Sequence, residues 1–231
     1  MNRRLTNIAR FVLDEMIPPA LRDRRWFMWP LFYVWFRGKN VRRMMDFKSL
    51  VYGMSREELR AFYRERDSLA SRRVTDLSEA SIARVLARLA PDVRSLLDVG
   101  CGRGYFLERV ARPGLRAHGC DVVDGVRLRA ATYCQADLEA LPFRDGQFDV
   151  VTCCHTLEHV IDLPAAVREL RRVARRQLIV VVPCQRWHYY TLDEHVQFFP
   201  RAEMLAHAIG LPGATCEKVA GDWVYSARLG P

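Results

Sequence analysis

From residue 95 onward, short strand-like runs alternate with stretches in which apolar residues recur at helical spacing. The runs are SLLDV at 95–99, RAHGCD at 116–121, FDVVTCC at 148–154 and QLIVVVP at 177–183. Runs without polar alternation are typical of strands buried on both faces, as in a parallel sheet covered by helices. Helices are predicted near residues 105–111 and 164–175. The pattern therefore predicts a doubly wound α/β fold.

Two further stretches complete this pattern. TYCQADLEALPF at 132–143 is expected to form an ordered loop. Residues 200–209 have the spacing of a helix that Gly210 ends, and two closing strands are predicted over 215–219 and 223–227.

The first third of the chain is predicted to be helical. SREE at 55–58 has the form of a capping box, and apolar residues follow it at helical spacing. A second helix is predicted from Ser78 to about Ala90, with apolar residues on one face. This helix leads into the strand at 95–99.

Charge divides the chain into two parts. Residues 1–74 hold 17 of the 36 Lys and Arg but only 8 of the 27 Asp and Glu, whereas residues 75–231 hold 19 of each. The formal net charge of +9 thus belongs to the first part, and a neutral second part suits a domain that handles a small ligand. We predict a basic, aromatic-rich helical extension or lid over 1–74 and a ligand-binding domain over 75–231.

Composition excludes several classes of protein. The 231 residues are 50% hydrophobic and 27% charged, which excludes disordered and collagen-like chains. The seven Cys are odd in number and contain no CxxC pair, which disfavours a disulfide framework or a zinc ribbon. We expect reduced, mostly buried thiols in a cytoplasmic protein.

The most unusual segment is WFMWPLFYVWF at 26–36, which holds seven aromatic residues between Arg-rich flanks. It is too short to cross a bilayer, which takes about 20 residues, and it lacks the features of a signal peptide. One interpretation is a packing element or lid over the second domain. Another is peripheral contact with the inner face of a membrane, where aromatic and Arg side chains suit the headgroup layer. Nucleic-acid contact is a third interpretation.

A glycine-rich turn follows the first strand of the second part. It runs from Asp98 through Gly100 and Gly102 to Gly104, just before a predicted helix. Glycines in this position let the backbone approach a ligand closely. Their spacing is not GxGxxG, because Tyr105 lies three residues after Gly102, and this disfavours a pyrophosphate site. The leading acid suits a cationic ligand better than an anionic one.

LLDVGCGRG at 96–104 resembles the first motif of the class I S-adenosylmethionine-dependent methyltransferases, in the form of a type 11-like methyltransferase domain. The likeness covers roughly residues 75–231. It implies a Rossmann-like, seven-stranded, mostly parallel sheet and S-adenosyl-L-methionine as cofactor, with S-adenosyl-L-homocysteine as product. It also implies that four residues of the turn line the cofactor site: Asp98, Gly100, Cys101 and Gly102.

Two later segments resemble the family's remaining cofactor motifs. Asp121 matches the acid that holds the ribose hydroxyls, with Val122 beside it and Asp124 as a nearby competitor. Asp137 and Leu138 resemble the adenine motif, in which a carboxylate accepts from the exocyclic amine and the next backbone amide meets the ring. The resemblance thus implies cofactor contacts at Asp121, Val122, Asp137 and Leu138.

One agreement and one departure concern the sheet. FDVV at 148–151 is similar to the family's fourth strand. The family usually carries a Pro-Gly-Gly turn before its fifth strand, and this chain has ARRQ at 174–177. The departure puts only that turn in doubt.

Methyl transfer to a hydroxyl needs alignment and a group that accepts the hydroxyl proton. The first candidate cluster is CHTLEH at 154–159, in which we predict that His155 faces the cofactor and can act as a base. HxxEH strings also occur in certain zinc peptidases, but there they lie within a helix, whereas this one follows a strand. Related quinone-modifying enzymes bind a divalent metal at positions similar to His155, Glu158 and His159. A divalent metal is therefore an alternative for this chain, and we assign no residue as a metal ligand.

The second candidate cluster follows the fifth strand, at 183–195. We predict that His195 is the general base or orients the acceptor, and that Asp193 or Glu194 orients His195. Trp187 and Tyr190 are predicted to shape the acceptor pocket, together with Glu194. The alternative is that Asp193 and His195 merely cap and pin the next helix.

These observations predict a methyltransferase that methylates an oxygen of a small molecule, or of a sugar in a lipid-linked glycan. RNA methylation is an alternative because the first third is basic, although only two of its 17 cations are Lys and the fourth strand lacks an Asn/Asp-Pro-Pro-aromatic string. A non-catalytic, cofactor-binding partner protein is another alternative. The His- and aromatic-rich loop at 187–199 argues against that alternative.

Overall fold

The computed structural model describes residues 12–65, 68–69 and 73–230. The chain divides into two compact units. The helical unit comprises residues 1–73 and 185–198, and the sheet unit comprises residues 74–184 and 199–231. Residues 185–198, which our division at residue 74 placed in the second domain, thus cluster with the N-terminal helices.

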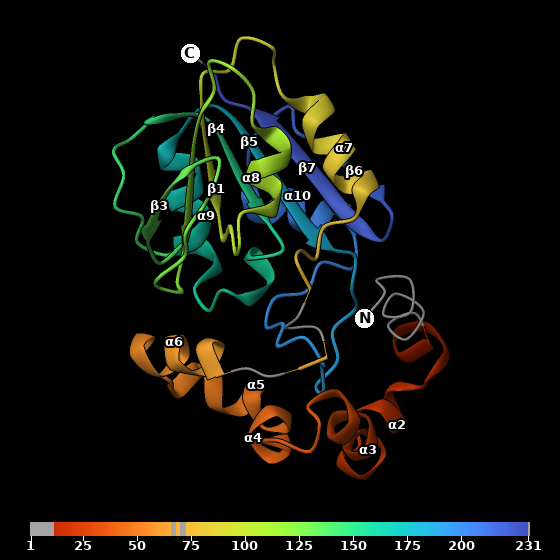
Figure 1. Cartoon of the computed structure of the whole chain (residues 1–231). Coiled ribbons are helices and arrows are strands. Elements are labelled where there is room, and N and C mark those ends of the chain that lie inside the picture. Colours follow the sequence, from red (N-terminus) through yellow and green to blue (C-terminus); the bar gives the residue numbers. More distant parts are fainter. Residues whose placement is uncertain (1–11, 66–67, 70–72, 231) are drawn as a thin grey trace. The chain divides into compact units, whose positions relative to one another are not determined.

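The sheet unit contains a seven-stranded sheet in the order β3-β2-β1-β4-β5-β7-β6 (Figure 1). Neighbouring strands from β3 through β5 are parallel, whereas β7 is antiparallel to both β5 and β6. The strands are β1 Ser95–Val99, β2 Arg116–Asp121, β3 Thr132–Gln135, β4 Phe148–Cys154, β5 Ala174–Pro183, β6 Thr215–Val219 and β7 Asp222–Arg228. The prediction of a mostly parallel, doubly wound sheet is confirmed.

Helices cover both faces of this sheet. They are α7 Glu79–Arg88, α8 Tyr105–Val110, η3 Leu157–His159, α9 Leu163–Val173 and α10 Ala202–Ile209. On one face α7 and α8 pack over Leu96 and Val150, and on the other face α9 and α10 pack over Leu97 and Val151. Successive residues of β1 and β4 therefore belong to opposite cores, which explains why these strands lack polar alternation.

Two predictions about the sheet were wrong. Residues 132–135 form the edge strand β3 inside the segment expected to be a loop, and its side chains are only partly buried or exposed. An edge strand needs no apolar run, so the hydrophobic pattern gave no signal for it. In addition, β5 begins at Ala174, where α9 ends, and Ala174 pairs with Phe148 of β4. The segment that replaces the Pro-Gly-Gly turn is therefore the start of the strand.

The helical unit contains η1 Val12–Met16, α2 Pro19–Arg22, α3 Arg25–Trp35, α4 Val41–Met45, α5 Phe47–Leu50, η2 Val51–Gly53 and α6 Arg56–Glu65. The predicted capping box is confirmed, because Ser55 N donates to Glu58 Oε2 at 2.7 Å and Glu58 N donates to Ser55 Oγ at 3.2 Å. Phe47 and Phe62 stack with ring centroids 4.7 Å apart. No helix among the described residues is long and apolar enough to cross a membrane.

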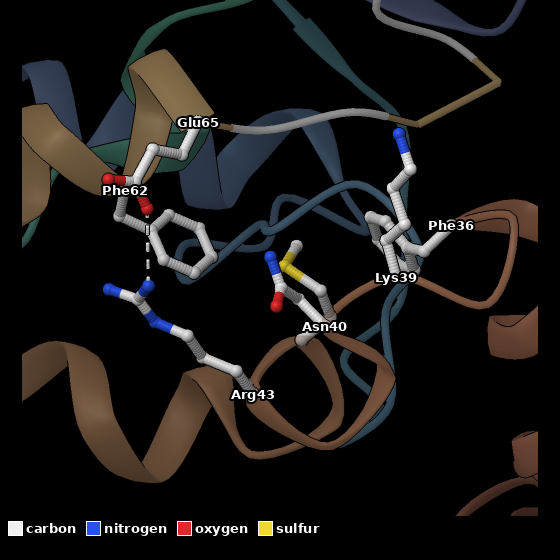
Figure 2. Close-up of a pocket in the computed structure, with 7 residues that line it drawn as sticks. Phe36, Lys39, Asn40, Arg43, Phe62 and Glu65 are labelled. Atoms are coloured by element: carbon white, nitrogen blue, oxygen red, sulfur yellow. Dashed lines mark hydrogen bonds and ion pairs between the residues drawn. The ribbon is translucent and has the colours of Figure 1, made fainter.

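A small groove lies among α3, α4 and α6 (Figure 2). Its lining residues are Phe36, Lys39, Asn40, Arg43, Met44, Phe62 and Glu65. The rings of Phe36 and Phe62 are buried, and the guanidinium of Arg43 lies 5.3 Å from the centroid of the Phe62 ring. Arg43 also pairs with Glu65 at 3.4 Å. The groove is thus apolar at its base and charged at its rim.

Candidate functional site

The glycine-rich turn between β1 and α8 contains three glycines with positive φ. Gly100, Gly102 and Gly104 have φ values of 73°, 51° and 80°. A Cβ at Gly100 would lie 1.9 Å from Oγ1 of Thr156, and one at Gly104 would lie 2.4 Å from the side chain of Leu128. A Cβ at Gly102 would meet no described atom within 4 Å. Packing therefore requires two of the glycines, whereas Gly102 presents bare backbone to open space, as close approach by a ligand requires.

Asp121 at the end of β2 lies directly beside this turn. Its Oδ2 accepts a hydrogen bond from Gly102 N at 2.9 Å, and its Oδ1 accepts one from Val123 N at 3.2 Å. The side chain is half-buried, whereas Asp124 is exposed. Val122 is also half-buried, and its carbonyl accepts from Gln135 at 2.9 Å. The structure thus brings Asp121 and Gly102 together as expected.

Asp98 in β1 supplies a second carboxyl group at the same edge of the sheet. It is 2% exposed and accepts a hydrogen bond from Thr152 Oγ1 at 2.7 Å. Burial raises the pKa of Asp98 to about 7, and the hydrogen bond from Thr152 opposes that shift while the charge of Asp121 adds to it. Two neighbouring acids at a glycine-rich turn favour a ligand that carries positive charge.

The segment proposed to meet adenine adjoins Asp121. Ala136 N donates to the carbonyl of Asp121 at 2.9 Å. Asp137 Oδ1 accepts from Glu139 N at 3.0 Å, which fixes its side chain in a turn, and Leu138 is buried. The residues predicted for three parts of the cofactor therefore follow one another along the ends of β1, β2 and β3.

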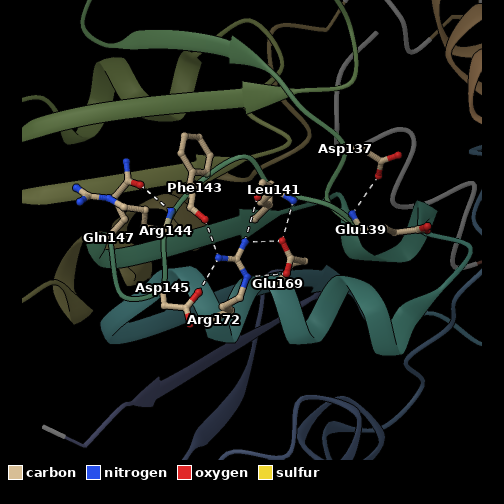
Figure 3. Close-up of polar contacts among 9 residues, drawn as sticks. All are labelled: Asp137, Glu139, Leu141, Phe143, Arg144, Asp145, Gln147, Glu169 and Arg172. Atoms are coloured by element: carbon tan, nitrogen blue, oxygen red, sulfur yellow. Dashed lines mark hydrogen bonds and ion pairs between the residues drawn. The ribbon is translucent and has the colours of Figure 1, made fainter.

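Arg172 of α9 holds the loop that follows Asp137 (Figure 3). Its guanidinium donates to the carbonyls of Phe143 at 2.6 Å and Leu141 at 3.0 Å. It also pairs with Glu169 at 2.7 Å, and Glu169 accepts from Leu141 N at 2.8 Å. These bonds join the loop to a helix of the core, so the turn at Asp137 is held from outside the site.

His155, directly after β4, is held between two carboxylates. Its Nδ1 lies 3.2 Å from Glu158 Oε1 and its Nε2 lies 3.4 Å from Asp222 Oδ1. Burial opposes the charged ring, but the two carboxylates outweigh burial and raise the pKa of His155 to about 10. A histidine that keeps its proton at neutral pH cannot accept another one. The two carboxylates therefore favour the protonated ring, which suits a structural role of His155 better than the predicted role as a base.

The sequence gave no reason to single out Asp222, which lies 67 residues beyond His155. It begins β7, is 1% exposed and also accepts from Ser81 Oγ of α7 at 2.8 Å. The register of β7 against β5 brings it to this place, with Asp222 opposite Pro183. An acid at the start of a strand is an ordinary turn residue until that pairing is known.

His195 belongs to the helical unit and has different neighbours. It is 4% exposed, and its Nδ1 lies 2.6 Å from Gln185 Oε1 and 3.5 Å from Asp193 Oδ1. With the Gln185 oxygen as acceptor, Nδ1 carries a proton. Asp193 therefore lies where we predicted an orienting acid, and Gln185 is a partner that sequence reasoning missed. Glu194 is buried with φ of 53°.

The structural alternative for Asp193 and His195 was that they cap the next helix. That helix, α10, begins at Ala202 with Arg201 as its N-cap, and no side chain among the described residues caps it by a hydrogen bond. Neither Asp193 nor His195 therefore caps α10, and the capping part of the alternative is wrong.

The loop at 185–198 is bonded to the N-terminal helices at several points. Arg22 donates to the carbonyl of Trp187 at 3.3 Å. Lys48 donates to the carbonyl of His188. Tyr189 contacts Asp23 and Ser49, each at 3.0 Å, and Tyr190 lies edge-on to Phe32 with centroids 6.2 Å apart. Tyr190 is therefore buried in this packing, whereas Trp187 is 57% exposed.

Lys48 lies inside this loop rather than in solvent. Its Nζ is 4.3 Å from the ring centroid of Phe198 and 5.6 Å from that of Trp187. Burial lowers the pKa of Lys48 to about 7, and the charges of Asp193 and Asp23 oppose that shift. The carboxylate of Asp193 thus favours the charged form of Lys48 and also lies 3.5 Å from Nδ1 of His195.

Comparison with known proteins agrees with this geometry. Residues 97–182 match a family described as a methyltransferase domain. The chain is 37% identical over 93 residues to a ubiquinone biosynthesis O-methyltransferase of Methylococcus capsulatus, covering 36% of this chain and 39% of that protein. It is 36% identical over 86 residues to a malonyl-[acyl-carrier protein] O-methyltransferase of Serratia marcescens, covering 35% and 34%. The matches thus span less than half the length of these relatives.

A solved structure extends the likeness beyond the matched segment. The crystal structure of a SAM dependent methyltransferase from Aquifex aeolicus covers 75% of this chain and 98% of its own, with a TM-score of 0.50 and 16% identity. At that identity the likeness concerns the fold alone. Residues 97–182 thus form a methyltransferase domain, and the likeness of fold extends beyond that segment.

Proposed function

We propose that the chain transfers a methyl group from S-adenosylmethionine to an oxygen atom of a small-molecule acceptor, which can be a sugar or a lipid-linked glycan. The observation that carries the proposal is the open backbone at Gly102, tied at 2.9 Å to the carboxylate of Asp121. Transfer to oxygen is supported by the names of two relatives, both O-methyltransferases, one in ubiquinone biosynthesis and one acting on malonyl-[acyl-carrier protein].

The residues of the sheet unit fit this cofactor chemically. The turn at Gly100–Gly102 would lie against the methionine part, with Asp98 nearby, and Asp121 would accept from the ribose hydroxyls. Asp137 and Leu138 would meet the adenine. When bound, the cofactor supplies a methyl group on a sulfonium and leaves as S-adenosylhomocysteine.

His195 accepts the acceptor's proton in this proposal. The hydroxyl proton passes to Nε2, while Nδ1 keeps its proton through the bond to Gln185. Asp193, 3.5 Å from Nδ1, stabilises the imidazolium that forms. A positioned base of this kind contributes roughly 10² to 10⁴ in rate.

The acceptor is proposed to approach along the loop at 185–198, where Trp187 presents an exposed aromatic face. A lipid-linked acceptor at the inner face of a membrane is supported by the basic, aromatic helices that hold this loop.

Paired variants at Asp121 and Asp124 test cofactor binding. Asp121→Asn should weaken S-adenosylmethionine binding, measured by calorimetry, by at least about tenfold, because it removes an ionised acceptor for the ribose hydroxyls. Asp124→Asn, a neighbouring exposed acid, should bind as the wild type does. Equal affinities in the two variants would contradict the proposed site.

Methyl-labelled cofactor and cell extract test the acceptor class. The proposal predicts label in the organic-soluble or small-molecule fraction, and labelling there that is slower by roughly 10² to 10⁴ with His195→Ala. Label in RNA or protein would overturn the acceptor class. Cofactor binding with no label in any extract tried would overturn the transferase activity and support a cofactor-binding partner protein.

A further inference from the structure

One face of helix α3 is apolar and exposed. Met28 and Phe32 on its inner side are fully buried. We define the α3 outer face by four exposed residues at helical spacing, Trp26, Pro30, Tyr33 and Val34. The exposed fractions of Trp26, Tyr33 and Val34 are 69%, 56% and 66%. A helix that is apolar on all sides is normally covered on all sides, so this face is suited to contact with another apolar phase or surface.

Positive charge surrounds this face. Residues 17–50 contain eight Lys and Arg but only two acids, Asp23 and Asp46. Both acids are already engaged, because Asp46 pairs with Arg25 at 2.6 Å and Asp23 accepts from the backbone of Tyr189. Exposed cations lie at both ends of α3, with Arg24 before the helix and Arg37 and Lys39 after it.

We propose that the α3 outer face docks on an anionic membrane surface, with the helix lying in the plane of the interface. Trp and Tyr rings are the side chains that favour the headgroup layer, and flanking cations attract anionic lipids. The eleven residues of α3 are far too few to cross the bilayer, so the contact is peripheral. A second copy of this chain fits less well, because it would bring two sets of cations together.

This docking goes beyond the proposed methyl transfer and is measured without cofactor or acceptor. The full chain is mixed with phosphatidylcholine vesicles that contain or lack phosphatidylglycerol, and bound protein is separated by flotation. The wild type should bind the anionic vesicles, and added salt should weaken that binding. Trp26→Ser/Tyr33→Ser/Val34→Ser should bind at least roughly tenfold more weakly.

The control changes two exposed apolar residues of the sheet unit, Val74→Ser/Met204→Ser, and should bind as the wild type does. The charge variant Arg24→Gln/Arg37→Gln/Lys39→Gln, which alters no apolar side chain, should also lose binding and keeps the test valid if the triple Ser variant misfolds. Equal binding by the wild type, the triple Ser variant and the charge variant would overturn the proposal. The proposal would also be overturned if the wild type did not bind vesicles, or if the wild type were a dimer in solution and the triple Ser variant a monomer.

Discussion

Two largely inaccessible histidines, one directly after β4 and one in the loop after β5, have different polar partners. His155 follows β4 and lies between the carboxylates of Glu158 and Asp222. His195 follows β5 by a loop and bonds through Nδ1 to the neutral amide of Gln185, with Asp193 at 3.5 Å. Two close carboxylates favour the protonated form of the first ring, whereas Nδ1 of the second ring faces one amide oxygen and one carboxylate. The type of partner, rather than position along the chain, separates a structural histidine from a candidate base.

The largest expected effect is on turnover. His195→Ala should lower kcat by roughly 10² to 10⁴ while leaving cofactor affinity unchanged, because it removes only the proton acceptor. Rates are measured with methyl-labelled cofactor and the acceptor fraction that takes up label. His207→Ala, at an exposed histidine of α10, is the matched control. A folded His195→Ala protein that turns over at the wild-type rate would contradict the proposed role of His195 as a base.

The next effect is on stability at His155. Asp222→Asn should lower the free energy of unfolding by about 3 kcal/mol, because it leaves a buried imidazolium with one carboxylate fewer. Urea unfolding measures the change. Asp92→Asn, which breaks only the exposed pair with Arg176, should change stability by less than about 1 kcal/mol. Similar losses in the two variants would show that the ion pair at His155 contributes little.

Stability should depend on pH with opposite signs in the two units. The pKa of His155 is raised from 6.5 to about 10, so its contribution is fully present below about pH 6.5 and is lost as pH rises through 10. The pKa of Lys48 is lowered from 10.5 to about 7, so the folded state gains stability as pH rises from 7 toward 10.5. The free-energy difference between wild type and His155→Gln should therefore shrink with rising pH.

The same measurements on Lys48→Met complete this test. Relative to the wild type, Lys48→Met should be most favourable at low pH and lose that advantage as pH rises. Slopes of the same sign for the two variants would contradict the assigned charges.

The smallest effect concerns the partner of His195. Gln185→Leu should lower kcat by about tenfold, which corresponds to the loss of one hydrogen bond of about 1 to 1.5 kcal/mol. Gln185→Asn, which keeps an amide, should recover part of the rate. A shift in the pH profile of kcat distinguishes an orienting role from simple packing, which would leave the profile unchanged.

The sequence was sufficient where signals are local. The runs at 95–99 and 148–154 identified β1 and β4 because both faces of those strands are buried, and the glycine-rich turn was predicted where the structure has it, between β1 and α8. The edge strand β3 was missed because it lacks an apolar run.

Long-range partners were beyond the reach of sequence reasoning. Whether a histidine is a base depends on groups that the fold brings in from far away. Asp222 reaches His155 only through the pairing of β7 with β5, and Gln185 reaches His195 across a loop with no regular period. Asp193 could be predicted as a neighbour of His195 because it lies two residues away along the chain.

The most direct test of the contrast is the protonation state of the two rings. Nitrogen-15 spectra of the histidines at pH 7.5, assigned with His155→Gln and His195→Gln, would report it. We expect His155 to be protonated on both nitrogens, and His195 to be neutral with its proton on Nδ1. A neutral His155, or a His195 that is charged or carries its proton on Nε2, would contradict it.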